Sequence, residues 1–433
     1  MRPRMPAVRW LRRAAALVAA LAVSLGALPA CDRRAPPDAA PPRQPDPDEL
    51  SRLQALGYVD WVDVTPADAG ENGVALLRPG RTEPGANLYA IYRAPRARLV
   101  DMAGSLIHEW AGTNPDDHWH HVELTPKGDL LAVAKGSALV RLDWNSAVKW
   151  RHEMNVHHDV ALDAEGRIYA LNAEIVQHAW GPRTIPIIAE NIAVLGPDGR
   201  LLRKISLHAL FAHLLPPQRL ASIARRSRGL RYWFRTLRGL SLPDGGGTDV
   251  YHANSIEILD RDVPGLGSRG DALVSIRELD LVAVIDLDAE RVVWSWGPGE
   301  IEGQHQPSVT PDGTLLVFDN GIERRWSRVV EVDPASRRIL WEYSGDPPHS
   351  LHSMGMGGAQ KLANGDVLVT ESERARAIEV SPAGEAVWIY YNPERDPSGQ
   401  RRRALYRLAR LAPDALARTP AALPRPASSR AGS

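Results

Sequence analysis

Short runs of alternating apolar and polar residues, separated by turn residues, fill the middle of the chain. One unit has such runs at 304–309, 314–318, 328–332 and 338–343, and Asp312-Gly313 lies between the first two. Alternation with a period of two predicts half-buried strands, and Asp-Gly between two runs predicts a hairpin turn. We therefore predict that this unit folds into four short strands.

The same unit recurs along the chain. Five copies have a tryptophan in their fourth strand: Trp110, Trp150, Trp294, Trp341 and Trp388. A sixth copy ends at 192–202 without a tryptophan. Repeats of roughly 40 to 50 residues with four strands each are typical of β-propellers. We predict an all-β fold, a six-bladed β-propeller with four-stranded blades, over residues 62–393. About 330 residues are ample for its core.

Histidines occupy the same place in several repeats. His120, His158 and His305 each lie eight residues before a turn glycine, and His252 opens a further repeat with an irregular turn. The innermost strand of each blade lines the channel of a propeller, so equivalent positions converge on its axis. We predict a ring of histidines in the channel. Gly357 takes this place in the last repeat, which predicts open space beside the ring.

The first 30 residues have the pattern of a lipoprotein signal peptide. A head with five arginines precedes an apolar stretch at 14–28, and roughly 15 residues are fewer than the about 20 that span a bilayer. The stretch ends in Leu-Pro-Ala-Cys, which resembles a bacterial lipobox, and Cys31 is the only cysteine. We predict lipidation of Cys31 and a bacterial membrane anchor, with the protein facing the periplasm or the cell exterior. A soluble secreted protein or an uncleaved anchor is the alternative.

Three segments depart from the repeat. Residues 31–61 form a Pro-rich tether with a short helix, and residues 394–433 form a basic tail, helical to about Leu411 and disordered in part. Residues 203–247 form a basic insertion with apolar residues at helical spacing. This insertion is a helical excursion packed on a blade, an amphipathic element on anionic lipid, or a lid over the channel.

The charges of the whole chain cancel. It has 52 basic and 52 acidic residues and a formal net charge of zero. A protein of this balance has no general electrostatic attraction for polyanions. We therefore expect no nucleic-acid partner.

Phrases throughout the repeats resemble the bacterial arylsulfate sulfotransferases, which are six-bladed propellers that work without 3′-phosphoadenylyl sulfate. The phrases are Leu-Val-Asp-Met-Ala-Gly-Ser-Leu-Ile-His-Glu-Trp at 99–110, His-His-Asp-Val at 157–160, His-Ala-Asn-Ser-Ile at 252–256, Ser-Ile-Arg at 275–277, Gln-His at 304–305 and Phe-Asp-Asn-Gly at 318–321. The resemblance implies transfer of a sulfuryl group from an aryl sulfate to a phenol, by a ping-pong mechanism with a sulfohistidine intermediate and without a cofactor or metal.

The resemblance also assigns roles to residues. It implies that His305 is the nucleophile, that His158 and His252 flank the sulfuryl group, and that Arg277 binds its oxygens. We further expect contacts to substrate from three more residues: Asn254, Asn320 and His352. One departure is Glu278, which follows Arg277 where related sequences often have histidine, so acceptor contacts are expected to differ.

The chemistry of these residues agrees with the implied reaction. Sulfuryl transfer places negative charge on oxygens, so it needs fixed cationic donors such as Arg277. A neutral imidazole at His305 can attack sulfur, and His158 or His252 can donate a proton to the departing phenolate. Two alternatives remain. Histidines near one axis can bind zinc or iron, although no carboxylate shares the repeat phase. The protein can also be a non-catalytic, membrane-tethered propeller that binds a protein or ligand.

Overall fold

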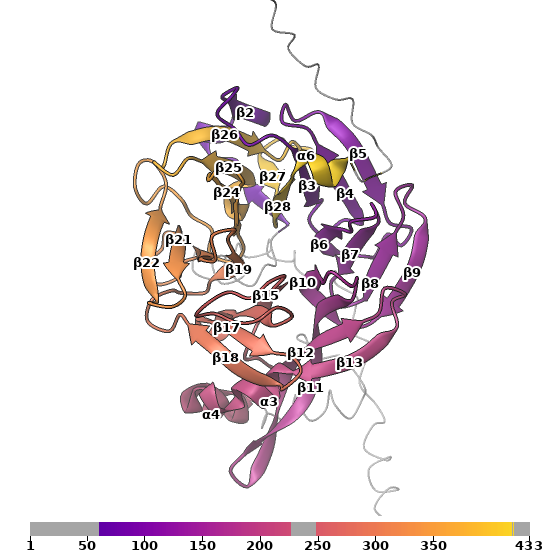
Figure 1. The fold of residues 1–433 in the computed structure, drawn as a ribbon, viewed down its shortest axis with the longest axis vertical. Helices are drawn as coiled ribbons and strands as arrows, with labels where there is room; N and C mark the ends of the chain where they lie inside the picture. The colour runs from indigo at the N-terminus through magenta and orange to yellow at the C-terminus, as the bar shows by residue number, and fades with distance from the viewer. Residues whose placement is uncertain (1–59, 227–247, 418, 420–433) are drawn as a thin grey trace, which may run out of the picture. The chain divides into compact units, whose positions relative to one another are not determined.

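Six antiparallel sheets surround a central axis in the part of the chain that the computed structural model describes, residues 60–226, 248–417 and 419 (Figure 1). Each of these sheets has four or five strands, and inner strands of neighbouring sheets contact one another around the ring. The fold is a six-bladed, all-β propeller with four-stranded blades, as predicted. No helix in these ranges is long and apolar enough to cross a membrane.

The strands of the first three blades follow, from the channel outward. Blade 1 contains β28 (Leu408–Leu411), β3 (Ala86–Ala90), β4 (Arg96–Val100) and β5 (Leu106–Ala111). Blade 2 contains β6 (Trp119–Leu124), β7 (Leu130–Ala134), β8 (Ala138–Leu142) and β9 (Val148–Glu153). Blade 3 contains β10 (Val156–Leu162), β11 (Ile168–Trp180), β12 (Arg183–Leu195) and β13 (Leu201–Ser206), and β14 (Thr248–Asp249) pairs with β12.

The other three blades continue the pattern. Blade 4 contains β15 (Ala253–Ile258), β16 (Ala272–Ile276), β17 (Leu281–Asp286) and β18 (Arg291–Trp296). Blade 5 contains β19 (His305–Val309), β20 (Leu315–Asp319), β21 (Arg328–Asp333) and β22 (Arg338–Tyr343). Blade 6 contains β23 (Gly358–Lys361), β24 (Val367–Glu371), β25 (Arg376–Val380) and β26 (Ala386–Tyr391), with β2 (Gly73–Leu77) at its outer edge. All five repeat tryptophans lie in a fourth strand.

Strand β7 shows why the inner strands are apolar on both faces. Its alternate residues Leu130 and Ala132 pack in a cluster with blade 1, whereas Leu131 and Val133 pack in a cluster with blade 3. All four side chains are fully buried. Each blade is enclosed by two neighbouring blades. Alternate residues of an inner strand therefore face two different cores, and neither set faces solvent. Burial of each larger side chain stabilises the fold by about 1.5–3 kcal/mol.

The propeller ends later than the sequence predicted. Strand β28 closes blade 1 by pairing with β3, and β27 (Arg401–Arg403) pairs with β1 (Trp61–Asp63), so the predicted boundary at residue 393 and the helix to Leu411 are wrong. The basic composition suggested a solvated tail, but two of its arginines are buried. Arg410 pairs with Glu379 at 3.0 Å, and Arg402 donates to the carbonyl of Asn392 at 2.6 Å. A short helix, α6 (Pro413–Leu416), follows.

The insertion after blade 3 is helical where it is described. Strand β13 continues to Ser206, and α3 (Leu207–Phe211), η2 (Ala212–Leu214) and α4 (Pro217–Arg226) follow. Their apolar side chains share one core cluster with Ile185 and Ile187 of β12. This packing agrees with a helical excursion on the flank of a blade. The remaining short helices are η1 (Pro66–Asp68), η3 (Arg277–Leu279) and η4 (Ser372–Arg374).

Residues 227–247 of the insertion, the predicted signal peptide and nearly all of the predicted tether lie outside the described residues. The same holds for Cys31 and for most of the chain after residue 419.

Candidate active site

Backbone bulges direct the predicted histidines. The pairing register shifts near the start of β10, β15 and β19, where the inner strands carry or adjoin His158, His252 and His305. At these places the backbone enters the left-handed region, with φ of 57° at His158, 49° at His252 and 45° at Gln306. Such conformations cost about 1–3 kcal/mol for residues other than glycine and occur most often at functional sites.

The hydrogen bonds around His305 determine which ring nitrogen carries its proton. Nδ1 lies 2.8 Å from Oδ1 of Asn320 and 3.1 Å from the carbonyl oxygen of Gly303. The amide of Asn320 cannot be turned, because its Nδ2 already donates to the carbonyls of Ser353 and Met356. Both neighbours of Nδ1 are therefore acceptors, so Nδ1 bears the hydrogen. The lone pair of the neutral ring is on Nε2.

The environment keeps His305 neutral. Burial lowers the pKa of His305 to about 3, and the positive charge of Arg277 adds to this effect, against the opposing hydrogen bond to Asn320. A charged imidazole loses hydration that the site does not replace. At neutral pH the ring of His305 is uncharged.

Arg277 begins η3, and its charge acts on His305. Arg277 is buried, with only 5 % of its surface exposed, and one of its amino groups donates to Glu278. Glu278 in turn accepts from Arg219 of helix α4, so the insertion reaches the site. The buried Nε of Arg277 has no partner within the described residues. It is a donor available to an anion.

His252 forms a pair with a carboxylate. Its Nδ1 lies 2.7 Å from Oδ2 of Asp249, and its backbone N–H donates to the other carboxylate oxygen at 2.8 Å. Although burial acts to raise it, the pKa of Asp249 is lowered by the charge of His252 and by the hydrogen bond from it. The ionised carboxylate of Asp249 accepts the hydrogen of Nδ1 and so fixes the orientation of the His252 ring.

His158 is enclosed by other rings. Its centroid lies 4.7 Å from that of His252, and its Nδ1 is 2.8 Å from Nδ1 of His157, so one of the two nitrogens donates and the other accepts. Burial lowers the pKa of His157 to about 3 and that of His158 well below the ordinary value. Both rings are neutral at pH 7. The carboxyl of Glu190 lies 3.5 Å from Nε2 of His157.

Three residues of the site were missed by the sequence analysis. Tyr406 packs against His120 and His158 at centroid distances of 5.6 and 6.3 Å, and its buried hydroxyl has no partner in the described parts of the chain. Arg407 pairs with Asp159 at 2.9 Å. The pKa of Lys135 is lowered to about 8 by burial and then by the charge of Arg93, and its ammonium makes no ion pair with any described residue.

The three expected substrate contacts have different places. Asn254 donates to the carbonyl of Gln304 at 2.8 Å, and Asn320 accepts from Nδ1 of His305, so both hold the segment that carries His305. His352 is partly exposed, with Nδ1 3.8 Å from the carboxylate of Glu373. The open space expected at Gly357 is absent, because a Cβ there would lie 2.5 Å from the ring of Phe318. An aromatic side chain of the neighbouring blade fills the gap.

No group of three or more histidine, cysteine, aspartate or glutamate side chains in the described ranges has the geometry to hold a metal ion. The histidine cluster instead adjoins arginine and tyrosine side chains. The described residues thus give no support to the metal-dependent alternative.

Residues 227–392 match the family described as "Arylsulfotransferase (ASST)". This part of the chain is similar to the arylsulfotransferase family. The match contains His252, Arg277 and His305 and leaves His158 outside. At family level it supports a sulfotransferase acting on small aryl substrates.

Solved structures of other propeller-like proteins are more distant. A protein of unknown function from Bacteroides caccae has a TM-score of 0.47 and 12 % identity, with 75 % of this chain and 98 % of that chain covered. A streptogramin B lyase has a TM-score of 0.45 and 11 % identity, with 82 % and 99 % covered. No curated protein matches this chain. None of these structural likenesses bears on its function.

Proposed function

We propose that the protein transfers a sulfuryl group from an aryl sulfate to a phenol in two steps, with a covalent intermediate on Nε2 of His305. The observation that carries the proposal is the pair of acceptors at Nδ1, Asn320 and Gly303, which leaves the lone pair on Nε2. Burial and Arg277 keep the ring neutral, as a nucleophile requires. The match to the arylsulfotransferase family supports the same reaction class.

In the first step, the lone pair of Nε2 attacks sulfur and an N–S bond forms. The S–O bond to the aryl group breaks, and its electron pair leaves on the aryl oxygen. The imidazolium of His252, stabilised by Asp249, gives its proton to this oxygen, so phenol departs. Arg277 and His158 surround the sulfuryl oxygens, on which negative charge develops. The modified ring of His305 keeps its Nδ1 proton against Asn320.

In the second step, the acceptor phenol loses its proton to the now neutral His252, and its oxygen attacks sulfur. The N–S bond breaks and its electron pair returns to Nε2. The products are a new aryl sulfate and the enzyme with His252 protonated again. His252 is favoured over His158 for this proton transfer because only His252 has a carboxylate on its second ring nitrogen.

The intermediate can be detected directly. We would incubate the wild type, His305→Ala and His305→Gln with 4-nitrophenyl sulfate and record intact masses after acid-free quenching. One added sulfuryl group on the wild type alone, with nitrophenolate release that rises when phenol is added, is the expected result. The control is His152→Ala, a histidine of the outer strand β9. Well-folded wild type without an adduct and without nitrophenolate release would contradict the proposal and favour the non-catalytic binding protein.

We further propose that the protein is a lipoprotein of the bacterial cell envelope, attached through Cys31. The lipobox-like sequence and the single cysteine support this. Expression in a bacterial host with an alkyne fatty acid, followed by membrane fractionation, tests it. Label on the wild type in the membrane fraction and its loss in Cys31→Ala are expected. Unlabelled wild type in the soluble fraction would exclude the anchor.

A further inference from the structure

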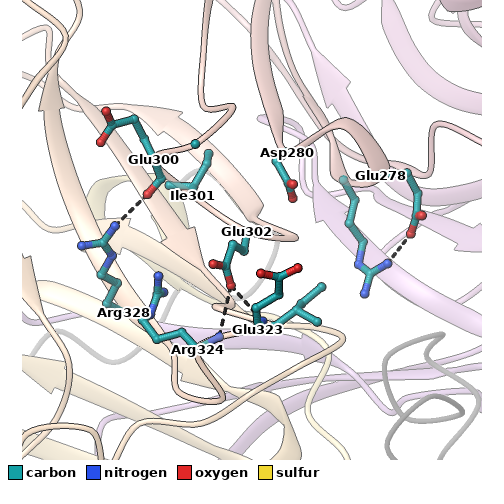
Figure 2. A pocket seen from close by; sticks show the side chains of 11 residues that line it. Glu278, Asp280, Glu300, Ile301, Glu302, Glu323, Arg324 and Arg328 are labelled. Atoms are coloured by element: carbon teal, nitrogen blue, oxygen red, sulfur yellow. Dashed lines mark hydrogen bonds and ion pairs between the residues drawn. The ribbon is translucent and has the colours of Figure 1, made fainter. Parts of the chain in front are cut away.

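A pocket opens between residues of blades 4 and 5 (Figure 2). Its volume is about 640 Å³, and Arg277 is one of the residues that line it. Arg277 belongs both to the wall of this pocket and to the surroundings of His305, because its charge acts on that ring. A Cβ at Gly303, two residues before His305, would lie 3.9 Å from Nε of Arg277. A ligand that holds its sulfuryl group at Arg277 can therefore extend into the pocket.

The wall of this pocket is acidic. Three guanidinium groups, of Arg277, Arg324 and Arg328, face five carboxylates: Glu278, Asp280, Glu300, Glu302 and Glu323. The arginines already have partners, because Arg277 pairs with Glu278 and the other two with Asp319 behind the wall.

The remaining four carboxylates form no ion pair with any described residue. Glu302 accepts only the backbone N–H groups of Glu323 and Arg324, and Asp280 accepts that of Gly303 at 2.7 Å. Burial raises the pKa of Asp280, and the charge of Glu302 raises it further. The negative potential of this wall is thus not neutralised by the protein itself.

The buried side of the pocket has the opposite character. The unpartnered Nε of Arg277 is a donor for an anion, while Ile322 provides an apolar surface above Gly303. A ligand that satisfies both sides carries a sulfuryl group at one end of an aromatic ring and a positive charge at the other. Opposite charges in a partly enclosed site attract more strongly than in water.

We infer that the substrates of this site are phenols, and their sulfate esters, that carry a cationic substituent such as an alkylammonium group. The inference rests on the proposed sulfuryl transfer and names its substrate class. The carboxylates of Glu302 and Asp280 bind the cation, and Arg277 binds the sulfuryl oxygens. Glu278 contributes less to the cation, because Arg277 and Arg219 already share its charge.

Competition between matched acceptors tests this. The full chain is supplied with 4-nitrophenyl sulfate and an equimolar mixture of 4-(2-aminoethyl)phenol, 4-(2-hydroxyethyl)phenol and 4-hydroxyphenylacetate, and the aryl sulfate products are quantified by liquid chromatography and mass spectrometry. The product ratios equal the ratios of kcat/KM. We expect the ammonium acceptor to exceed the neutral one by about tenfold or more, which corresponds to about 1.4 kcal/mol, and the carboxylate acceptor to be poorest.

Two variants connect the preference to the wall. Glu302→Gln keeps an acceptor for the backbone N–H groups of the 323–324 loop, and Asp280→Asn keeps one for Gly303 and suits the left-handed backbone at 280, where φ is 49°. Each should lower the ammonium-to-neutral ratio several-fold. Asp312→Asn, at the opposite end of β19, is the matched control and should leave the ratio unchanged.

The outcomes separate the two proposals. Sulfated products from all three acceptors without a preference for the ammonium compound would overturn the substrate class and leave the transferase intact. A preference that persists in both variants would remove the assignment to Glu302 and Asp280. No sulfated product from any acceptor, with no adduct on His305, would instead overturn the proposed function itself.

Discussion

The formation of sulfo-His305 should be almost independent of pH down to about pH 5. Only the neutral ring attacks sulfur, and burial together with Arg277 lowers its pKa to about 3. At pH 5 a group with this pKa is ~99 % neutral, whereas one with the ordinary value is only ~3 % neutral. The site thus predicts a loss of a few per cent between pH 7.5 and pH 5, against roughly thirtyfold for an ordinary histidine.

The burst of nitrophenolate from 4-nitrophenyl sulfate isolates this step. Nitrophenolate leaves without a proton, so the burst rate reports the nucleophile and not His252. Stopped samples brought to alkaline pH give the released nitrophenolate, and circular dichroism at each pH shows that the protein remains folded. In Arg277→Met we expect a slower burst with an acid midpoint moved toward 6.5, because one cause of the lowered pKa is removed.

A burst rate of the folded wild type that halves near pH 6.5 would refute this reasoning. The nucleophile would then titrate as an ordinary imidazole, and the buried geometry around Asn320 would not describe the reacting state. An unchanged midpoint in Arg277→Met would show instead that burial alone sets the pKa.

Three further predictions concern other residues of the site. Asp249→Asn should slow turnover of phenyl sulfate about 10²- to 10³-fold but turnover of 4-nitrophenyl sulfate far less, since only the poorer leaving group needs the proton of His252. Equal losses for both donors would contradict the role of His252 as proton donor. The pKa of Lys135 is about 8, so the KM for aryl sulfates should rise above that pH as the ammonium loses its charge. Lys135→Met should have a KM about tenfold higher at pH 7, which corresponds to about 1.4 kcal/mol, and its KM should not rise further at alkaline pH. Burial lowers the pKa of His157 from 6.5 to about 3, so below pH 6.5 the unfolded chain binds a proton that the folded chain does not. The free energy of unfolding should therefore fall by about 1.4 kcal/mol per pH unit toward pH 3, and urea titrations of His157→Gln should show a shallower loss.

The repeat made most of the fold predictable. The strand expected at 338–343 agrees with β22, and the strand expected at 304–309 differs from β19 by one residue. The end of the propeller was not predictable from composition, because a strand of four residues among arginines has the pattern of a solvated tail. Burial of Arg402 and Arg410 depends on carbonyl and carboxylate acceptors in distant segments, which no local pattern contains.

The site shows the same limit. Phase in the repeat brought His158, His252 and His305 to one axis, since equivalent strand positions are equivalent in space. Arg407 was not predicted as a site residue, although it lies near the start of an inner strand, as the histidines do. Its carboxylate partner Asp159 lies 248 positions away in the sequence, so no local pattern indicates the pair. The apolar alternation of Leu408–Leu411 is the signal that could have extended the repeat to it.

The closure of blade 1 by β28 makes the site depend on a segment that is far along the chain from the other strands of that blade. Tyr406 and Arg407 immediately precede β28, so the pairing of β28 with β3 places them beside His158 and Asp159. A chain that lacks these residues keeps His120, His158, His252 and His305, but its ring of blades is not closed. Such a chain lacks two residues of the site, so we expect chains that are cleaved before Tyr406 to have no transferase activity.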